Sequence, residues 1–188
     1  MNQRIADKIT SWSLGPEYSV DSDKFQIVSY GILLMIETVY KILILMILGE
    51  KIGACLETVA FLIGFCGLRK FAGGLHMKTS LGCMMSVVVL WSLSIVCSMY
   101  CIPYPLYVII SLLTFILVGI YAPCSTLNNP IKSKELRKRK KVYALAYAVT
   151  LTIVAYILGN LGYRSVKTVL IVSMTLEGLT IIHRRKEI

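Results

Sequence analysis

The chain has 188 residues, of which 56% are hydrophobic, and it carries a formal net charge of +10. This composition excludes an ordinary soluble domain, and it predicts a single membrane-embedded all-α domain over residues 1–188. The six cysteines form no C-x-x-C pair and only two histidines are present, so we expect no metal site, no cofactor and reduced thiols.

Residues 2–14 are predicted to form an amphipathic helix that lies in the membrane interface. Its apolar side chains recur at helical spacing opposite its charged ones, with Ile5, Ile9 and Trp12 on one face and Arg4, Asp7 and Lys8 on the other. A terminus without regular structure is the alternative. Asp21 or Ser22 can cap the helix that follows.

A polytopic bundle of about six transmembrane helices is predicted from the apolar segments near residues 25–49, 52–68, 81–102, 106–121, 142–159 and 166–182. The second segment is short and carries Glu57, so a tilted or re-entrant helix is an alternative there. In the first segment, Glu37 and Lys41 lie four residues apart and are expected to pair on one helix face.

The cations predict the orientation of these segments. With the N-terminus inside, sixteen of the twenty Lys and Arg residues face the cytosol and three face outside, namely Lys51, Arg164 and Lys167. Because cytosolic loops of membrane proteins are rich in Lys and Arg, both termini are predicted to be cytosolic. The same holds for a loop over 69–83 and a basic loop over 122–141.

The loop over 69–83 is the candidate catalytic site. On an unbroken helix, His76 and Cys83 would lie about 10.5 Å apart, so their side chains meet only if the chain folds back between them. Gly73 and Gly74 allow such an irregular backbone. Thr79 or Ser80 can cap a helix that starts near Leu81, which places Cys83 in the first turn, where the thiolate is favoured. A core cysteine and an interfacial histidine are the plain alternative.

The segment Arg69-Lys70-x-Ala72-Gly73-Gly74-x-His76-x-Lys78-Thr79-x-x-x-Cys83 resembles the signature of the accessory gene regulator protein B family. A second match runs from Tyr121-Ala122-Pro123 through Asn129-Pro130, before the basic run. Members of this family are integral-membrane cysteine peptidases that process the precursor of a bacterial quorum-sensing peptide.

The resemblance implies that His76 and Cys83 are catalytic and that the precursor has an acidic C-terminal tail, which we expect the flanking cations Arg69, Lys70 and Lys78 to hold, with a role in membrane topology alone as the alternative for each. It further implies an acyl-enzyme thioester that is released as a thiolactone, in a multi-pass protein of the bacterial cell membrane. We also expect membrane lipids and a second copy of the chain as partners, and no nucleic acid. The candidates for a group that orients His76 are Glu57, Asn128 and Asn129, and the other five cysteines are given no role.

Two other classes of function stay open on the sequence. A small transporter would use intramembrane charges as its path, namely Glu37, Lys41, Glu57 and Glu177. A non-enzymatic membrane partner would use the amphipathic terminus and the basic loop as docking surfaces. The substitution Cys83→Ser distinguishes these classes, because a peptidase would lose its cleavage activity, whereas a transporter or a membrane partner would keep its activity.

Overall fold

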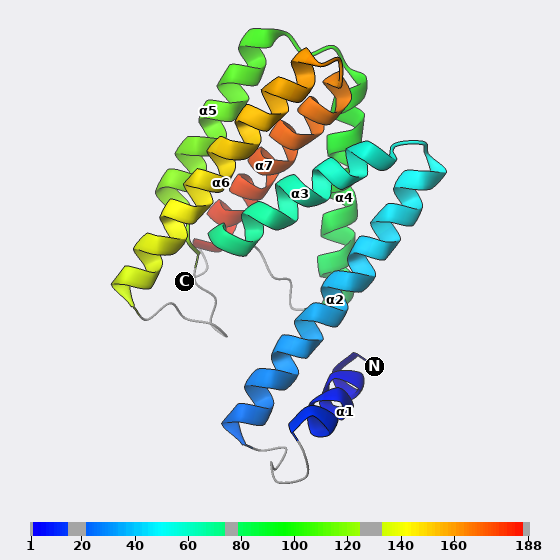
Figure 1. Cartoon of the computed structure of the whole chain (residues 1–188), viewed down its shortest axis with the longest axis vertical. Helices are drawn as coiled ribbons and strands as arrows, with labels where there is room; N and C mark the ends of the chain where they lie inside the picture. Colours follow the sequence, from blue (N-terminus) through cyan, green and yellow to red (C-terminus); the bar gives the residue numbers. More distant parts are fainter. Residues whose placement is uncertain (1, 15–21, 74–78, 125–132, 186–188) are drawn as a thin grey trace. The chain divides into compact units, whose positions relative to one another are not determined.

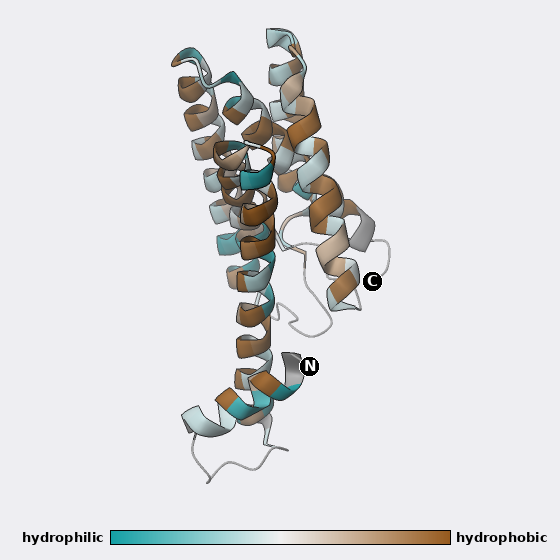
Figure 2. Cartoon of the chain, turned by 90° about the vertical axis from the view of Figure 1, so that its right-hand side faces the viewer, coloured by the Kyte–Doolittle hydropathy of each residue, from teal (hydrophilic) through white to brown (hydrophobic). Residues whose placement is uncertain are grey.

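The computed structural model describes residues 2–14, 22–73, 79–124 and 133–185, and the regular structure in these ranges is helical (Figure 1). The helices are α1 (Asn2–Leu14), α2 (Asp23–Lys51), α3 (Cys55–Ala72), α4 (Ser80–Met99), α5 (Tyr104–Tyr121), α6 (Lys134–Asn160) and α7 (Arg164–Arg185). Five of them, α2 and α4 to α7, are long and apolar enough to cross a membrane, and Figure 2 shows hydrophobic residues along these helices. The predicted class, an all-α membrane protein, is confirmed.

Helix α3 corresponds to the short second apolar segment and is not among these five. Its 18 residues span about 27 Å, close to the thickness of the hydrocarbon core. However, Glu57 lies in its first turn and Arg69 and Lys70 lie in its last. A sixth crossing at α3 therefore stays a prediction.

The structure corrects the predicted boundaries of the two polar loops. The loop predicted over 69–83 is helical at its start, because α3 continues through Ala72, and the loop predicted over 122–141 is helical from Lys134 onward. Lys and Arg are good helix formers, and they extend each helix beyond its apolar part. At α6, Ser133 Oγ accepts a hydrogen bond from Leu136 N at 3.5 Å and fixes the start of the helix.

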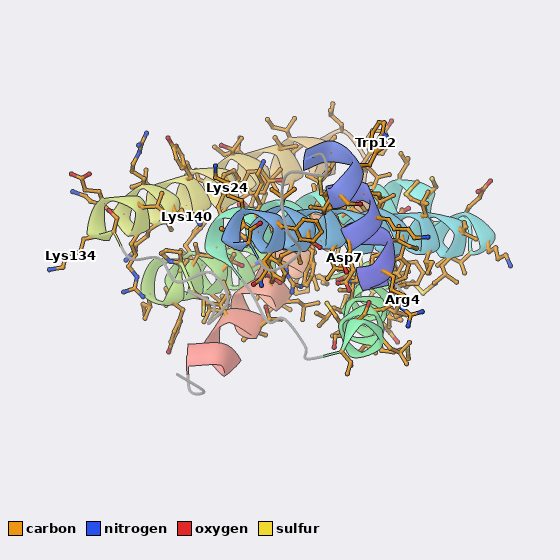
Figure 3. All side chains as sticks on the ribbon, turned by 90° about the horizontal axis from the view of Figure 1, so that it is seen from below. Arg4, Asp7, Trp12, Lys24, Lys134 and Lys140 are labelled. Carbon is orange, nitrogen blue, oxygen red and sulfur yellow. The ribbon has the colours of Figure 1, made fainter. Side chains whose placement is uncertain are left out.

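Contacts divide the chain into two units, Met1–Leu48 and Gly49–Ile188. In the first unit α1 forms as predicted, with Ile5, Ile9 and Trp12 exposed, and Ser29 Oγ donates to Asp7 Oδ1 at 2.5 Å. Figure 3 shows Arg4, Asp7 and Trp12 along α1. The predicted cap at Ser22 is confirmed, since Phe25 N donates a hydrogen bond to Ser22 Oγ. The predicted pairing of Glu37 with Lys41 is also confirmed, since Lys41 Nζ lies 3.5 Å from Glu37 Oε2.

In the second unit, α7 is the helix around which the others pack. It contacts α3, α4, α5 and α6, and residues 168–175 are buried without interruption. A helix that is buried on all sides must satisfy its polar side chains internally. Thr168 and Thr175 of α7 do so by hydrogen bonds of 2.7 Å to α5, with Tyr107 Oη and Thr114 Oγ1 respectively.

One core cluster packs the last turns of α3 and the end of α5 against α6 and α7. Its buried members are Leu68, Ala72, Val118, Ala122, Ala144, Ala148, Met174 and Ile181, from α3, the end of α5, α6 and α7. Ala144 and Ala148 of α6 are fully buried in this cluster, and α6 packs against α3, α5 and α7. Such small side chains permit short distances between membrane helices. The cluster fixes where the last turn of α3 lies.

Candidate active site

The end of α3 is closed by a glycine in a conformation that other residues avoid. Gly73 has φ +77° and ψ −172°, and its N–H donates to Arg69 O at 2.9 Å. A Cβ at this position would lie 2.6 Å from Cys124 O. The prediction that Gly73 allows an irregular backbone here is confirmed, and the structure adds a second reason for glycine, which is the close approach of Cys124.

The two sequence motifs meet at this point. Cys124 N donates to Ala72 O at 2.9 Å, so the segment Ala122–Cys124 lies directly against the last turn of α3. Sequence reasoning gave Cys124 no role, because its contribution comes from the backbone, which residue type does not reveal. The only signal was the neighbouring Tyr121-Ala122-Pro123 element.

The start of α4 is as predicted from the capping residues. Thr79 is the N-cap, and its Oγ1 accepts a hydrogen bond from Gly82 N at 3.2 Å. Cys83 lies in the first turn and its N–H donates to Thr79 O at 3.1 Å. Of the two proposed caps, the structure uses Thr79, and Ser80 is the first residue of the helix.

Cys83 faces the interior of the bundle. Its side chain is 5% exposed, whereas those of Leu81 and Met85 are 72% and 55% exposed. Cys83 shares its buried face with Val87 and Trp91, which follow at intervals of four residues. Trp91 Nε1 donates to Thr58 Oγ1 of α3 at 3.0 Å, and this buried bond fixes the rotation of α4 against the bundle.

The remaining five cysteines differ from Cys83 in burial. Cys55 and Cys101 are exposed, and Cys66, Cys97 and Cys124 are half-buried. All six cysteines belong to the described residues and none forms a disulfide. Cys83 is thus the one thiol that is both buried and located in a first helical turn.

The two described cations of the motif lie on the last turns of α3. Lys70 is exposed, with Nζ 5.8 Å from the Phe71 ring centroid. Arg69 is half-buried, with its guanidinium carbon 5.8 Å from the Phe65 ring centroid, and it interacts electrostatically with Glu177 of α7. Lys70 is accordingly open to a ligand from outside, whereas the charge of Arg69 also acts on a buried carboxyl group.

Glu177 itself is completely buried. Its Oε2 accepts a hydrogen bond from Thr180 Oγ1 at 3.1 Å, and its Oε1 has no partner among the described residues. Sequence reasoning assigned Glu177 only to a transporter path. Its proximity to Arg69 was missed, and the available signal was that it is the sole acidic residue within the last apolar segment.

The other candidate residues are distributed differently from the sequence prediction. Glu57 lies at the start of α3, about 24 Å along the helix from Gly73, and its Oε1 accepts a hydrogen bond of 2.6 Å from Ser165 Oγ. The structure does not bring Glu57 near the end of α3 that carries the motif. The remaining candidates, Gly74, His76, Lys78, Asn128 and Asn129, lie outside the described residues. Within the described ranges, no three metal-ligating side chains gather.

Fold and site together define a polytopic helical membrane protein with one buried thiol at the capped start of a helix. A cation-bearing end of a second helix, closed by Gly73, precedes this helix in the chain.

The chain belongs to the accessory gene regulator B family, whose sequence profile matches residues 2–181. It is 26% identical to an AgrB-like protein of Clostridium perfringens strain SM101, over 91% of this chain and 83% of the relative. It is 30% identical to AgrB-like protein 2 of C. perfringens strain 13, over 75% of this chain and 67% of the relative. It is 23% identical to accessory gene regulator protein B of Staphylococcus carnosus, over 83% of each chain. No solved structure matches the chain. The predicted family is confirmed, and with it a role in accessory gene regulation.

Proposed function

We propose that the protein is a membrane cysteine endopeptidase that removes the C-terminal tail of a quorum-sensing precursor peptide and closes the remaining core into a thiolactone. The observation that carries the proposal is the position of Cys83. It is a buried thiol in the capped first turn of α4, seven residues after His76 in the chain. Unpaired N–H groups and the helix dipole favour a thiolate there.

In the proposed reaction, His76 accepts the proton of the Cys83 thiol, and the sulfur attacks the carbonyl carbon of the peptide bond that follows the core. The C–N bond then breaks, and His76 returns the proton to the nitrogen of the departing tail. A thiol of the core attacks the resulting thioester, which forms the thiolactone and releases Cys83 as the thiol. The reaction needs no oxidant or other co-reactant.

The oxyanion formed in each attack requires hydrogen-bond donors. Gly82 N–H already donates to Thr79 Oγ1 and Cys83 N–H to Thr79 O. In the proposal, the earlier N–H groups of this turn, those of Ser80 and Leu81, stabilise the oxyanion. The cap keeps the turn in place while charge develops.

The acidic tail of the precursor is proposed to bind along the cations of the motif, Arg69, Lys70 and Lys78. Two features support this. Lys70 is exposed at the end of α3, and the first turns of α6 carry further exposed cations, of which Figure 3 shows Lys134. In this proposal Arg69 has two roles, since its charge also stabilises the carboxyl group of Glu177.

We further propose that both termini, the catalytic segment and the start of α6 face the cytosol. The distribution of Lys and Arg over the two ends of the helices supports this orientation. We also propose that the whole chain acts as one peptidase domain, and that two copies associate. Neither arrangement is needed for the chemistry above.

The test is precursor cleavage by the full chain in phospholipid nanodiscs, with single Cys→Ala variants at all six positions. Cys83→Ala should abolish cleavage, whereas Cys97→Ala, which lies farther along the same helix, should retain it. Cleavage by Cys83→Ala, or an equal loss in Cys97→Ala, would contradict the assignment. A thioester between the precursor core and Cys83, trapped by acid quenching and detected by mass spectrometry, would support it directly.

The transporter alternative receives no support from the described residues. Glu57 is bound by Ser165 at the start of α7, and Glu177 lies twelve residues farther on, a separation of about 18 Å along the helix. The two carboxyl groups therefore do not form a continuous polar path through the second unit.

A further inference from the structure

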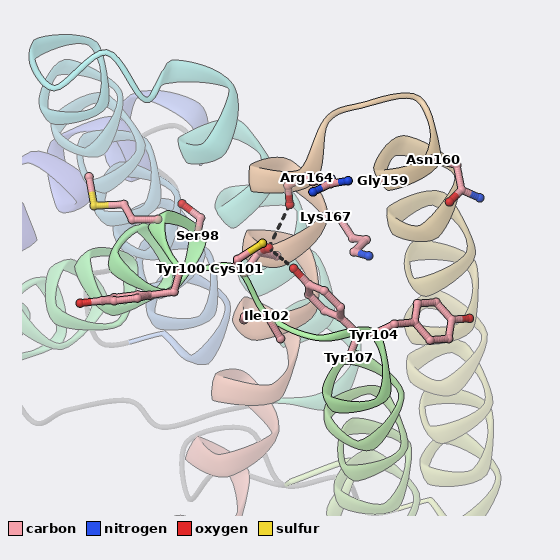
Figure 4. Close-up of a pocket in the computed structure, with 12 residues that line it drawn as sticks. Ser98, Tyr100, Cys101, Ile102, Tyr104, Tyr107, Gly159, Asn160, Arg164 and Lys167 are labelled. Carbon is pink, nitrogen blue, oxygen red and sulfur yellow. Dashed lines mark hydrogen bonds between the residues drawn. The ribbon is translucent and has the colours of Figure 1, made fainter.

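A second polar site lies at the opposite end of the second unit from Thr79. A cavity of about 440 Å³ opens between the α4–α5 turn and the α6–α7 turn (Figure 4). Its lining comes from four helix ends and comprises Ser98, Met99, Tyr100, Cys101, Ile102, Tyr104, Tyr107, Gly159, Asn160, Arg164, Lys167 and Thr168. No catalytic candidate contributes to it, so it is a separate site.

Two cations, Arg164 and Lys167, line this cavity. Neither Arg164 nor Lys167 forms an ion pair with a described residue, and the lining contains no Asp or Glu. Two like charges on one helical turn repel each other, and an anion between them would remove that cost. The cavity is therefore suited to an anionic ligand.

Aromatic rings hold Lys167 in position. Its Nζ lies 3.8 Å from the centroid of Tyr107, 5.4 Å from that of Tyr156 and 6.0 Å from that of Tyr104. Its aliphatic stem passes over Gly159, where a Cβ would collide with it. Tyr107 is itself fixed, because its hydroxyl forms a 2.7 Å hydrogen bond with Thr168 Oγ1. The ammonium group is thus held in place before any ligand arrives.

The location of the cavity indicates which anion it binds. The 20 residues of α4 separate it from Thr79 by about 30 Å, which equals the thickness of the hydrocarbon core. It therefore lies at the level of lipid headgroups, where tyrosines are enriched. Met99 and Tyr100 of the lining are 79% and 70% exposed, and they offer apolar surface to acyl chains beside the cations. A free anion would gain nothing from that surface.

We propose that this cavity binds the phosphodiester group of an anionic membrane phospholipid, with Lys167 and Arg164 as its charged contacts. The phosphate oxygens accept charge-assisted hydrogen bonds from both side chains. The acyl chains extend along the exposed apolar residues of the α4–α5 turn.

The experiment uses the full chain in detergent, with titrated phosphatidylglycerol and native mass spectrometry of the lipid retained. The variants are Arg164→Gln, whose exposed side chain can be replaced without disturbing packing, and the double variant Arg164→Gln/Lys167→Gln. Lys51→Gln removes an exposed cation outside the cavity and serves as the matched control. We expect about tenfold weaker retention for each lost charge-assisted contact, and wild-type retention for Lys51→Gln.

Phosphatidylcholine and inorganic phosphate are the comparison probes. The proposal requires phosphatidylglycerol to be retained more strongly than phosphatidylcholine, and inorganic phosphate in the millimolar range to displace little of it. Undiminished retention in Arg164→Gln, or an equal loss in Lys51→Gln, would overturn the site. Thermal stabilisation by inorganic phosphate that equals that by phosphatidylglycerol would overturn the assignment to a lipid.

Discussion

Gly73 offers a strong test of the site, because two independent features of the structure forbid a side chain there. With φ +77° and ψ −172°, it occupies a region that essentially only glycine adopts, and the strain for another residue is of the order of 1–3 kcal/mol. In addition, the Cβ of Gly73→Ala would lie 2.6 Å from Cys124 O. This oxygen belongs to the backbone and cannot rotate away, so the clash adds to the strain.

We therefore expect Gly73→Ala to destabilise the protein by at least about 2 kcal/mol and to lower its unfolding midpoint by roughly 4–8 °C. The substitution should also separate the last turn of α3 from Cys124. Precursor cleavage should therefore decrease even at temperatures well below the unfolding midpoint, where the variant is still folded. The assays are thermal unfolding and precursor cleavage, both in nanodiscs.

The matched control is Gly119→Ala in α5, where the added Cβ has no atom within 4 Å other than those of its chain neighbours and of the backbone of its own helix. It should be neutral or stabilising by up to about 1 kcal/mol, because alanine is the better helix former. If Gly73→Ala matched Gly119→Ala in both assays, the conformation of Gly73 and its contact with Cys124 would not matter to the site, and this reasoning would be refuted.

Three further predictions concern the cap, the cations and the orientation. Thr79→Ala should destabilise the start of α4 by about 1 kcal/mol and reduce cleavage, whereas Thr79→Ser, which keeps the capping hydroxyl, should retain both stability and cleavage. Equal behaviour of the two variants in thermal unfolding and cleavage would exclude a capping role. Lys70→Gln should raise the KM for precursor several-fold more than it lowers kcat, and the defect should shrink when the acidic tail is neutralised; strictly additive losses in this double-mutant cycle would exclude contact with the tail. Single cysteines introduced at Lys138 and Pro103, in a background without native cysteines, should be labelled from the cytosolic and the external side respectively, and cytosolic labelling at Pro103 would contradict six crossings.

Much of this protein follows from local sequence patterns. The apolar segments predicted a helical membrane protein because a chain in lipid must satisfy its own backbone hydrogen bonds. Thr79 predicted the start of α4, and the i,i+4 spacing of Glu37 and Lys41 predicted their pairing, since both depend on residues within one turn. The exact ends of α3 and α6 were missed, because Lys and Arg permit both loop and helix outside the apolar core.

Contacts between distant segments were decided only by the tertiary structure. The hydrogen bond from Cys124 N to Ala72 O joins segments about fifty residues apart, and the interaction of Arg69 with Glu177 crosses more than one hundred. The tyrosines around Lys167 likewise come from α5 and α6. Hydrophobic periodicity predicts which face of a helix is apolar, but it does not predict which other helix packs against that face. Where α7 packs against four helices, that choice is made by the shapes of small and polar side chains such as Gly64 and Ser173, and these act only once the helices meet.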